Sequence, residues 1–104
     1  MKILKTWENV SLLNYKIMKT IYKYPLTLSD NPISMIKGAE ILTVKLQNGT
    51  PTLWALVDED EYLQESRLIV IRGTGHTIED NAKHITTYMD DPFVWHVFEL
   101  TDLI

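Results

Sequence analysis

Apolar and polar positions change their spacing near residue 18 of this chain. Over the first 17 residues, apolar side chains recur every three or four positions, which places them on one face of a helix. These residues are Ile3, Leu4, Trp7, Val10, Leu13 and Ile17. From Thr20 onward, β-branched and aromatic residues form short runs that are typical of strands. The runs predict strands over 20–24, 33–36, 40–47, 50–58, 67–72, 84–89 and 93–100.

The clearest local signal is Asn48-Gly49 between two apolar runs, because a two-residue hairpin turn needs positive φ at both central positions. Such a turn sets the register, with Gln47 opposite Thr50 and Val44 opposite Leu53. The same register predicts one shared face for Leu42, Val44, Leu46, Leu53, Ala55 and Val57. Leu42 is expected opposite Ala55, and Pro51 opposite Leu46. The other face carries Ile41, Trp54 and Leu56, so both faces of this hairpin are apolar.

A hairpin with two apolar faces belongs in a sandwich, under a helix or in an oligomer interface. We therefore predict a mainly β fold, either a small antiparallel sandwich or a partly open barrel, with a helical extension over 1–17 and one domain over 18–104. Residues 77–83 are expected to form a turn or one to two helical turns, with Thr77 as the cap. The exposed apolar surface predicts a homo-oligomer, most simply a dimer.

Composition narrows the class of protein. A chain of 104 residues is one domain, and the absence of cysteine excludes disulfides and thiolate metal sites. No apolar run reaches the length of a membrane span and no signal peptide is apparent, so we expect a cytoplasmic protein. The net charge of −4 and a count of two arginines, Arg67 and Arg72, argue against direct nucleic-acid binding. The acidic run 58–61 is interpreted as a solvated loop rather than a cation site or a phosphate mimic.

One segment carries candidate chemistry: Arg72, Gly73, Thr74, Gly75 and His76 directly follow an apolar strand. Two glycines around a threonine let backbone N–H groups turn toward one point, and a nest of this kind binds anions. The arginine and the imidazole would add donors suited to a phosphate. The spacing matches neither a P-loop nor a dinucleotide fingerprint. A β-bulge or tight turn is the simpler interpretation, and it remains open beside the anion site.

Other residue types give weaker signals. Trp54 and Trp95 lie on predicted strands and could stack a nucleobase, although such rings more often belong to a core or an interface. The three histidines, His76, His84 and His96, lack metal-ligand spacing, so no metal is expected. No nucleophile signature accompanies them, so no catalytic residue and no cofactor are assigned.

Four segments carry a family resemblance: MKTIYKYPL, KGAEILTVKLQNGTPTLWALVD, GTGH and FVWHVFEL. Together they resemble a family of small uncharacterised proteins encoded by phages, prophages and some bacteria. The resemblance runs from about Met18 to Glu99, and residues 1–17 depart from it. It implies no established activity. It does imply the context of an accessory protein that counters host defence, by sequestering a nucleotide immune signal or by blocking a nuclease.

The sequence leads to three functional hypotheses. The first is a non-catalytic module that holds a small phosphate-bearing ligand through Arg72, Gly73, Thr74, Gly75, His76, Trp54 and Trp95. The second is a protein–protein inhibitor or scaffold that acts through the acidic loop and the apolar sheet face. The third is a small hydrolase that uses His76 or His96.

Overall fold

The computed structural model describes residues 18–101, and within them the chain is all β, with no helix. The mainly β prediction is therefore confirmed, whereas the predicted helix over 1–17 lies outside the described residues. The strands are β1 (Lys19–Pro25), β2 (Ile33–Ile36), β3 (Glu40–Gln47), β4 (Thr50–Asp58), β5 (Gln64–Gly73), β6 (Ala82–Asp90) and β7 (Phe93–Leu100).

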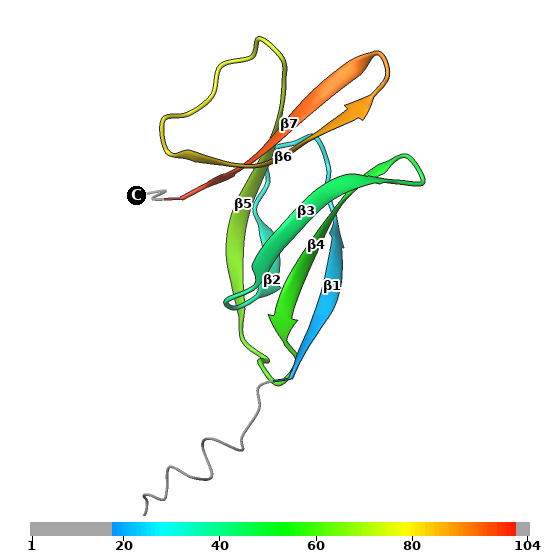
Figure 1. Ribbon diagram of the computed structural model, residues 1–104. Helices are drawn as coiled ribbons and strands as arrows, with labels where there is room; N and C mark the ends of the chain where they lie inside the picture. Colours follow the sequence, from blue (N-terminus) through cyan, green and yellow to red (C-terminus); the bar gives the residue numbers. More distant parts are fainter. Residues whose placement is uncertain (1–17, 102–104) are drawn as a thin grey trace, which may run out of the picture.

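The strands form two antiparallel sheets rather than a closed barrel (Figure 1). The first sheet has the order β1–β4–β3 and the second has the order β2–β5–β7–β6. β2 is thus an edge strand and β5 is an inner strand. The sheets meet where β3 of the first lies against β6 of the second.

The Asn48-Gly49 hairpin forms as predicted, with φ of 52° and 80° at its two turn residues. Its register agrees with the prediction from the turn to Thr43, including Val44 opposite Leu53 and Pro51 opposite Leu46. Beyond Thr43 the predicted register is wrong. A β-bulge makes Leu42 an extra residue, so that Ile41 lies opposite Ala55. Leu42 is consequently 44% exposed, while Ile41 packs against the core.

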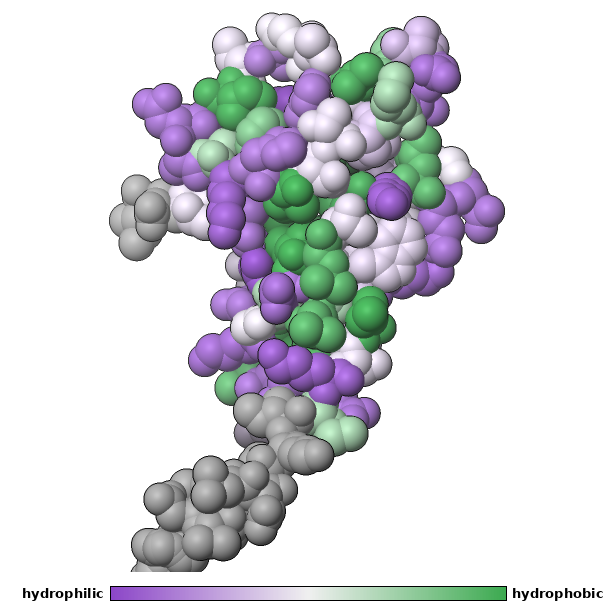
Figure 2. Space-filling model, viewed as in Figure 1, coloured by the Kyte–Doolittle hydropathy of each residue, from purple (hydrophilic) through white to green (hydrophobic). Residues whose placement is uncertain are grey.

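The core lies between the two sheets. Inward-facing residues of the first sheet meet those of the second, because successive side chains of a strand alternate between its faces. Fully buried or nearly buried members include Met35, Val44, Leu53, Ala55, Val57, Ile69, Ile71, Tyr88 and Val97. The outer side of the first sheet remains partly apolar, and Figure 2 shows apolar surface gathered along the middle of the molecule, over β3 and β4. Trp54 and Leu56 are half-buried there, and Ile21 is exposed.

Of the two alternatives for 77–83, the turn is the one observed: the Ala82 N–H donates to the Glu79 carbonyl at 3.1 Å, and no helix forms. The reason is topological. β5 and β6 are parallel, with β7 between them, so the connection must run back along the sheet from Gly73 to the level of Leu68. That return is five residues of strand, or about 17 Å. The tight turn closed by the His76 N–H on the Gly73 carbonyl does not advance the chain, and Ala82 and Lys83 already pair with β7. The remaining five residues would cover only about 7 Å as a helix. The segment is instead an irregular loop that ends in the turn at residues 80 and 81, and it sweeps outward in Figure 1.

Residues 18–101 contain no helix that is long and apolar enough to cross a membrane.

Because the Tyr88 side chain is buried, the free energy of unfolding is expected to fall at alkaline pH. Burial, with a smaller contribution from Asp90, raises the pKa of the Tyr88 hydroxyl above its ordinary 10.0. Because the folded pKa lies above the unfolded value, the neutral ring contributes its full stability below about pH 10, and that stability is lost as the pH rises further. We expect Tyr88→Phe to flatten the alkaline fall in the free energy of unfolding, measured by urea titration at several pH values. An equally steep fall in both proteins would contradict this assignment.

Candidate functional site

The end of β5 is shaped by a close contact between Gly73 and His76. The imidazole covers the Gly73 Cα so closely that an added Cβ would lie 3.1 Å from the ring. The Gly73 N–H donates to His76 Nδ1 at 3.1 Å, and the His76 N–H donates to the Gly73 carbonyl at 3.1 Å. Gly75 has a φ of 91°, which residues with a side chain rarely adopt, so steric constraints favour glycine at both positions. Since Nδ1 accepts, the proton of the neutral ring is on Nε2, where it can be donated to a ligand.

This turn forms one wall of a hollow at the tip of the second sheet, with a volume of about 490 Å³. The opposite wall comes from the β6–β7 turn and the start of β7. The rings of Phe93 and Trp95 lie side by side there, with centroids 5.7 Å apart. The full lining is Gly73, Thr74, His76, Pro92, Phe93, Val94 and Trp95. A volume of this size suits a small molecule, and a mostly apolar lining with a few polar groups is typical of ligand pockets.

Arg72 lies outside the hollow. Consecutive residues of a strand face opposite sides, so the Arg72 side chain lies on the other face from the His76 ring, which covers Gly73. The guanidinium forms a two-pronged ion pair with Asp30, 2.9 Å for each bond, and contacts Glu79 at 3.0 Å. The hydrogen bonds from Arg72 hold the pKa of Asp30 below its ordinary value. The expected convergence of Arg72 and His76 on one anion is therefore not present, because two carboxylates already neutralise the arginine.

The other expected ligand residues divide between the two sheets. Thr74, His76 and Trp95 line the hollow with Gly73, and Gly75 belongs to the same turn. Trp54 lies on β4 of the first sheet, where it pairs with Lys23 and Thr43, and does not line the hollow. The sequence thus located the turn and one of its aromatic partners. It missed Phe93, which is two residues before Trp95 and so on the same strand face.

Hydrogen bonds link two of the histidines across the second sheet. His96 Nε2 lies 2.8 Å from the Thr74 hydroxyl, and His96 Nδ1 lies 3.0 Å from the Thr87 hydroxyl. The Thr87 hydroxyl also lies 3.0 Å from His84 Nε2. A hydroxyl beside an imidazole nitrogen has the spacing of a nucleophile and its base. Hydroxyls alone orient this ring, however, and a catalytic base of that type is normally oriented by a group that also stabilises the imidazolium.

The acidic run 58–61 has a local structural role. The Asp58 carboxylate accepts the Asp60 N–H, and the Glu61 carboxylate accepts the Leu63 N–H, each at 2.9 Å. Carboxylates that bond to nearby backbone N–H groups stabilise turns. These contacts agree with the solvated-loop interpretation. Across residues 18–101, no cluster of three or more acidic or histidine side chains could hold a metal ion.

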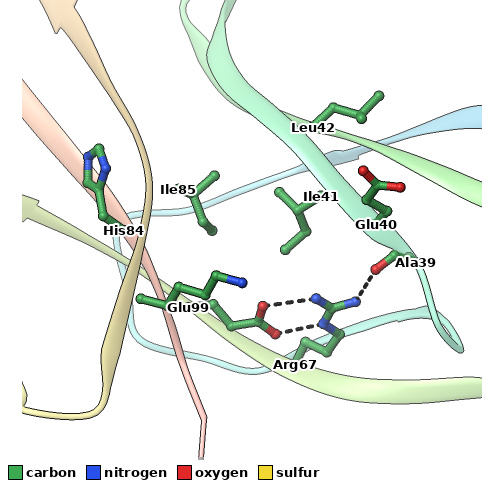
Figure 3. A pocket seen from close by; sticks show the side chains of 9 residues that line it. Ala39, Glu40, Ile41, Leu42, Arg67, His84, Ile85 and Glu99 are labelled. Atoms are coloured by element: carbon green, nitrogen blue, oxygen red, sulfur yellow. Dashed lines mark hydrogen bonds and ion pairs between the residues drawn. The ribbon is translucent and has the colours of Figure 1, made fainter.

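A second concave feature, a cleft of about 390 Å³ between β3 and β6, was not anticipated (Figure 3). Its floor is an ion pair between Arg67 and Glu99, whose side chains are only 17% and 14% exposed. Two bonds of 2.6 and 2.9 Å join them, and Arg67 Nη1 donates to the Ala39 carbonyl at 2.6 Å. These contacts raise the pKa of Arg67, chiefly through the bonds to Glu99. The sequence signal for this ion pair was that Arg67 and Glu99 each lie in a largely apolar strand segment.

A comparison with protein-family models matches residues 18–103 to a family described as a domain of unknown function, DUF7352. The chain belongs to this family. Comparison with curated proteins gave no match, and comparison with solved structures gave none either.

The DUF7352 match begins at Met18, where the resemblance drawn from the sequence also begins, and it spans all seven strands. Both the hollow and the cleft therefore lie within the DUF7352 region. The family description names no ligand or reaction, so any function must be argued from the geometry of these two features.

Proposed function

We propose that this protein is a non-catalytic binding module that holds a small nucleotide-like ligand in the hollow at the tip of the second sheet. The observation that carries the proposal is the pair of rings, Phe93 and Trp95, lining the same hollow as His76, whose Nε2–H is accepted by no residue within 18–101. Aromatic side chains offer every base a surface to stack on, which is worth about 1–3 kcal/mol per base. The 490 Å³ volume accommodates a base with its sugar.

The charges around the hollow favour recognition of the ring over recognition of the phosphate. Arg72, the arginine of this strand end, is paired with Asp30 and Glu79 and does not line the hollow. A phosphate would therefore rely on His76 Nε2–H and on neighbouring backbone N–H groups. We expect a nucleoside to retain most of the affinity of its nucleotide, and ribose 5-phosphate to bind far more weakly than either.

Sequestration is the biological role that fits a binding module without turnover. A protein that holds a nucleotide lowers its free concentration, and the resemblance to phage and prophage proteins suggests an immune signal as the nucleotide. This part of the proposal requires a ligand concentration below that of the protein in the cell. It is tested by measuring whether the purified protein depletes cyclic or linear nucleotides from solution and releases them unchanged after denaturation.

The binding proposal is tested by removing one ring. Phe93 is 56% exposed, so Phe93→Ser should leave the fold intact while weakening nucleotide binding about ten- to a hundredfold through lost stacking. Isothermal titration against cyclic and linear nucleotides and their nucleosides measures the loss. Tyr62→Ser is the matched control, because Tyr62 is 83% exposed and does not line the hollow. Equal affinities in all three proteins, or no binding by the unaltered chain, would overturn the proposal.

An alternative function, as a protein–protein inhibitor or scaffold, is favoured by the apolar outer side of the first sheet. Ile21 lies opposite Leu56 and beside Trp54 on that side, and β1 is an edge strand. The same surface supports the proposed homo-oligomer. Light scattering at micromolar concentration distinguishes a dimer from a monomer.

A hydrolase using Thr74 and His96 is distinguished by turnover of whichever ligand binds.

A further inference from the structure

Two β-bulges face each other across the cleft between the sheets. Leu42 is the extra residue of β3 and Ile85 is the extra residue of β6. Both side chains line the cleft, and Ile41 and Ile85 point toward one another in Figure 3. Bulges re-aim side chains, and they are common beside binding sites. Here they place a patch of three aliphatic side chains, Ile41, Leu42 and Ile85, at the junction of the two sheets.

Four charged side chains line the cleft: Arg67 and Glu99 pair with one another, whereas Lys83 and Glu40 have no ion-pair partner among the described residues. Arg67 and Glu99 bind one another through Nε and Nη2 of the guanidinium, and its third nitrogen, Nη1, donates to the Ala39 carbonyl. Lys83 and Glu40 also line the cleft and are exposed, and within the described range neither forms an ion pair. The cleft therefore presents one uncommitted cation and one uncommitted anion beside an aliphatic patch.

The electrostatic environment of Lys83 differs from that of Glu40. Lys83 lies opposite Glu99 in the β6–β7 pairing, and the Glu99 carboxylate binds the half-buried Arg67. Glu40 begins β3 and lies on the β3 side of the cleft, across from His84, in Figure 3. His84, the remaining titratable residue of the lining, has its ring against Phe98 and its Nε2 on Thr87. A ligand with a single charge would be attracted by one of Lys83 and Glu40 and repelled by the other.

We propose that this cleft binds a small aliphatic zwitterion, of which an apolar amino acid is the simplest example. The carboxylate is held by Lys83, the ammonium by Glu40, and the aliphatic side chain lies on Ile41, Leu42 and Ile85. This site is separate from the hollow and does not depend on the nucleotide proposal.

Four small probes test each part of this recognition. L-leucine carries all three features. The compound 4-methylpentanoate lacks the ammonium, 3-methylbutylamine lacks the carboxylate, and glycine lacks the aliphatic chain. We expect L-leucine at millimolar concentration to shift the amide resonances of Ile41, Lys83 and Ile85, and each of the other three to bind at least about tenfold more weakly. Absence of shifts with L-leucine, or equal binding of 4-methylpentanoate, overturns the proposal.

Charge variants separate recognition from folding. Lys83→Met and Glu40→Gln should each weaken L-leucine binding about tenfold, and Lys83→Arg should restore much of the loss. Lys45→Met and Glu59→Gln are the matched controls, because both residues are exposed and neither lines the cleft. A thermal melt of each variant shows that it is folded. Binding that is unchanged in Lys83→Met, or lost equally in Lys45→Met, contradicts the assignment.

Discussion

Arg67→Met is expected to lower the free energy of unfolding by up to about 3–5 kcal/mol, the cost of removing one partner of a fully buried ion pair, because this pair is largely buried. Glu99 would be left 14% exposed without its cation, and the Ala39 carbonyl would lose its donor. Ala39 precedes β3 of the first sheet and Arg67 is on β5 of the second, so the substitution also breaks a link between the sheets. Urea unfolding measures the change.

Two further variants separate the buried pair from a general effect of losing arginine. Arg72→Met should cost only about 0–1 kcal/mol, because its partners Asp30 and Glu79 are largely exposed. The double variant Arg67→Met/Glu99→Leu should recover most of the loss, since no uncompensated charge remains buried. Equal destabilisation by Arg67→Met and Arg72→Met would show that the pair beneath the cleft has no special structural role.

Leu53→Ala is expected to lower the free energy of unfolding by about 2–5 kcal/mol, whereas Leu42→Ala should change it by about 0.5 kcal/mol. The regular hairpin register places both leucines on one buried face. The bulge instead leaves Leu42 44% exposed while Leu53 is fully buried. The two substitutions remove the same atoms, so the difference in unfolding free energy reports the burial of each site.

The same comparison tests the bulge itself. A loss of stability for Leu42→Ala that equals the loss for Leu53→Ala would mean that the hairpin keeps its regular register in solution. Because Leu42 lines the cleft, Leu42→Ala should also weaken L-leucine binding without weakening nucleotide binding.

Most of the fold was accessible from local patterns in the sequence. The Asn48-Gly49 turn fixes its own φ angles and the pairing of the next few residues, and the apolar run 67–72 forms a strand as predicted. Local patterns failed at the bulges, because an extra residue in a strand leaves no signature when both Ile41 and Leu42 are apolar. They left a turn and a helix open at 77–83, and the length of the return along the sheet, which local patterns do not show, excludes the helix.

The candidate site was located only in part, for an electrostatic reason. The sequence shows that Arg72 precedes the Gly73 turn, but Asp30 lies 42 residues away and its pairing with Arg72 depends on the tertiary fold. The pairing of Arg67 with Glu99 across 32 residues is hidden in the same way. Phe93 is the exception, since its spacing from Trp95 already predicts that both rings share one side of a strand.

The central claim, that the hollow binds a nucleotide-like ring, is tested most directly by nuclear magnetic resonance of the labelled full chain. We expect a bound nucleotide or nucleoside to produce its largest shifts at the backbone amides of Gly73, Thr74 and His76 and at the Trp95 indole N–H. Trp54, on the first sheet, should be unaffected. Largest shifts at Trp54, or no shifts with any member of the nucleotide panel, would contradict the account.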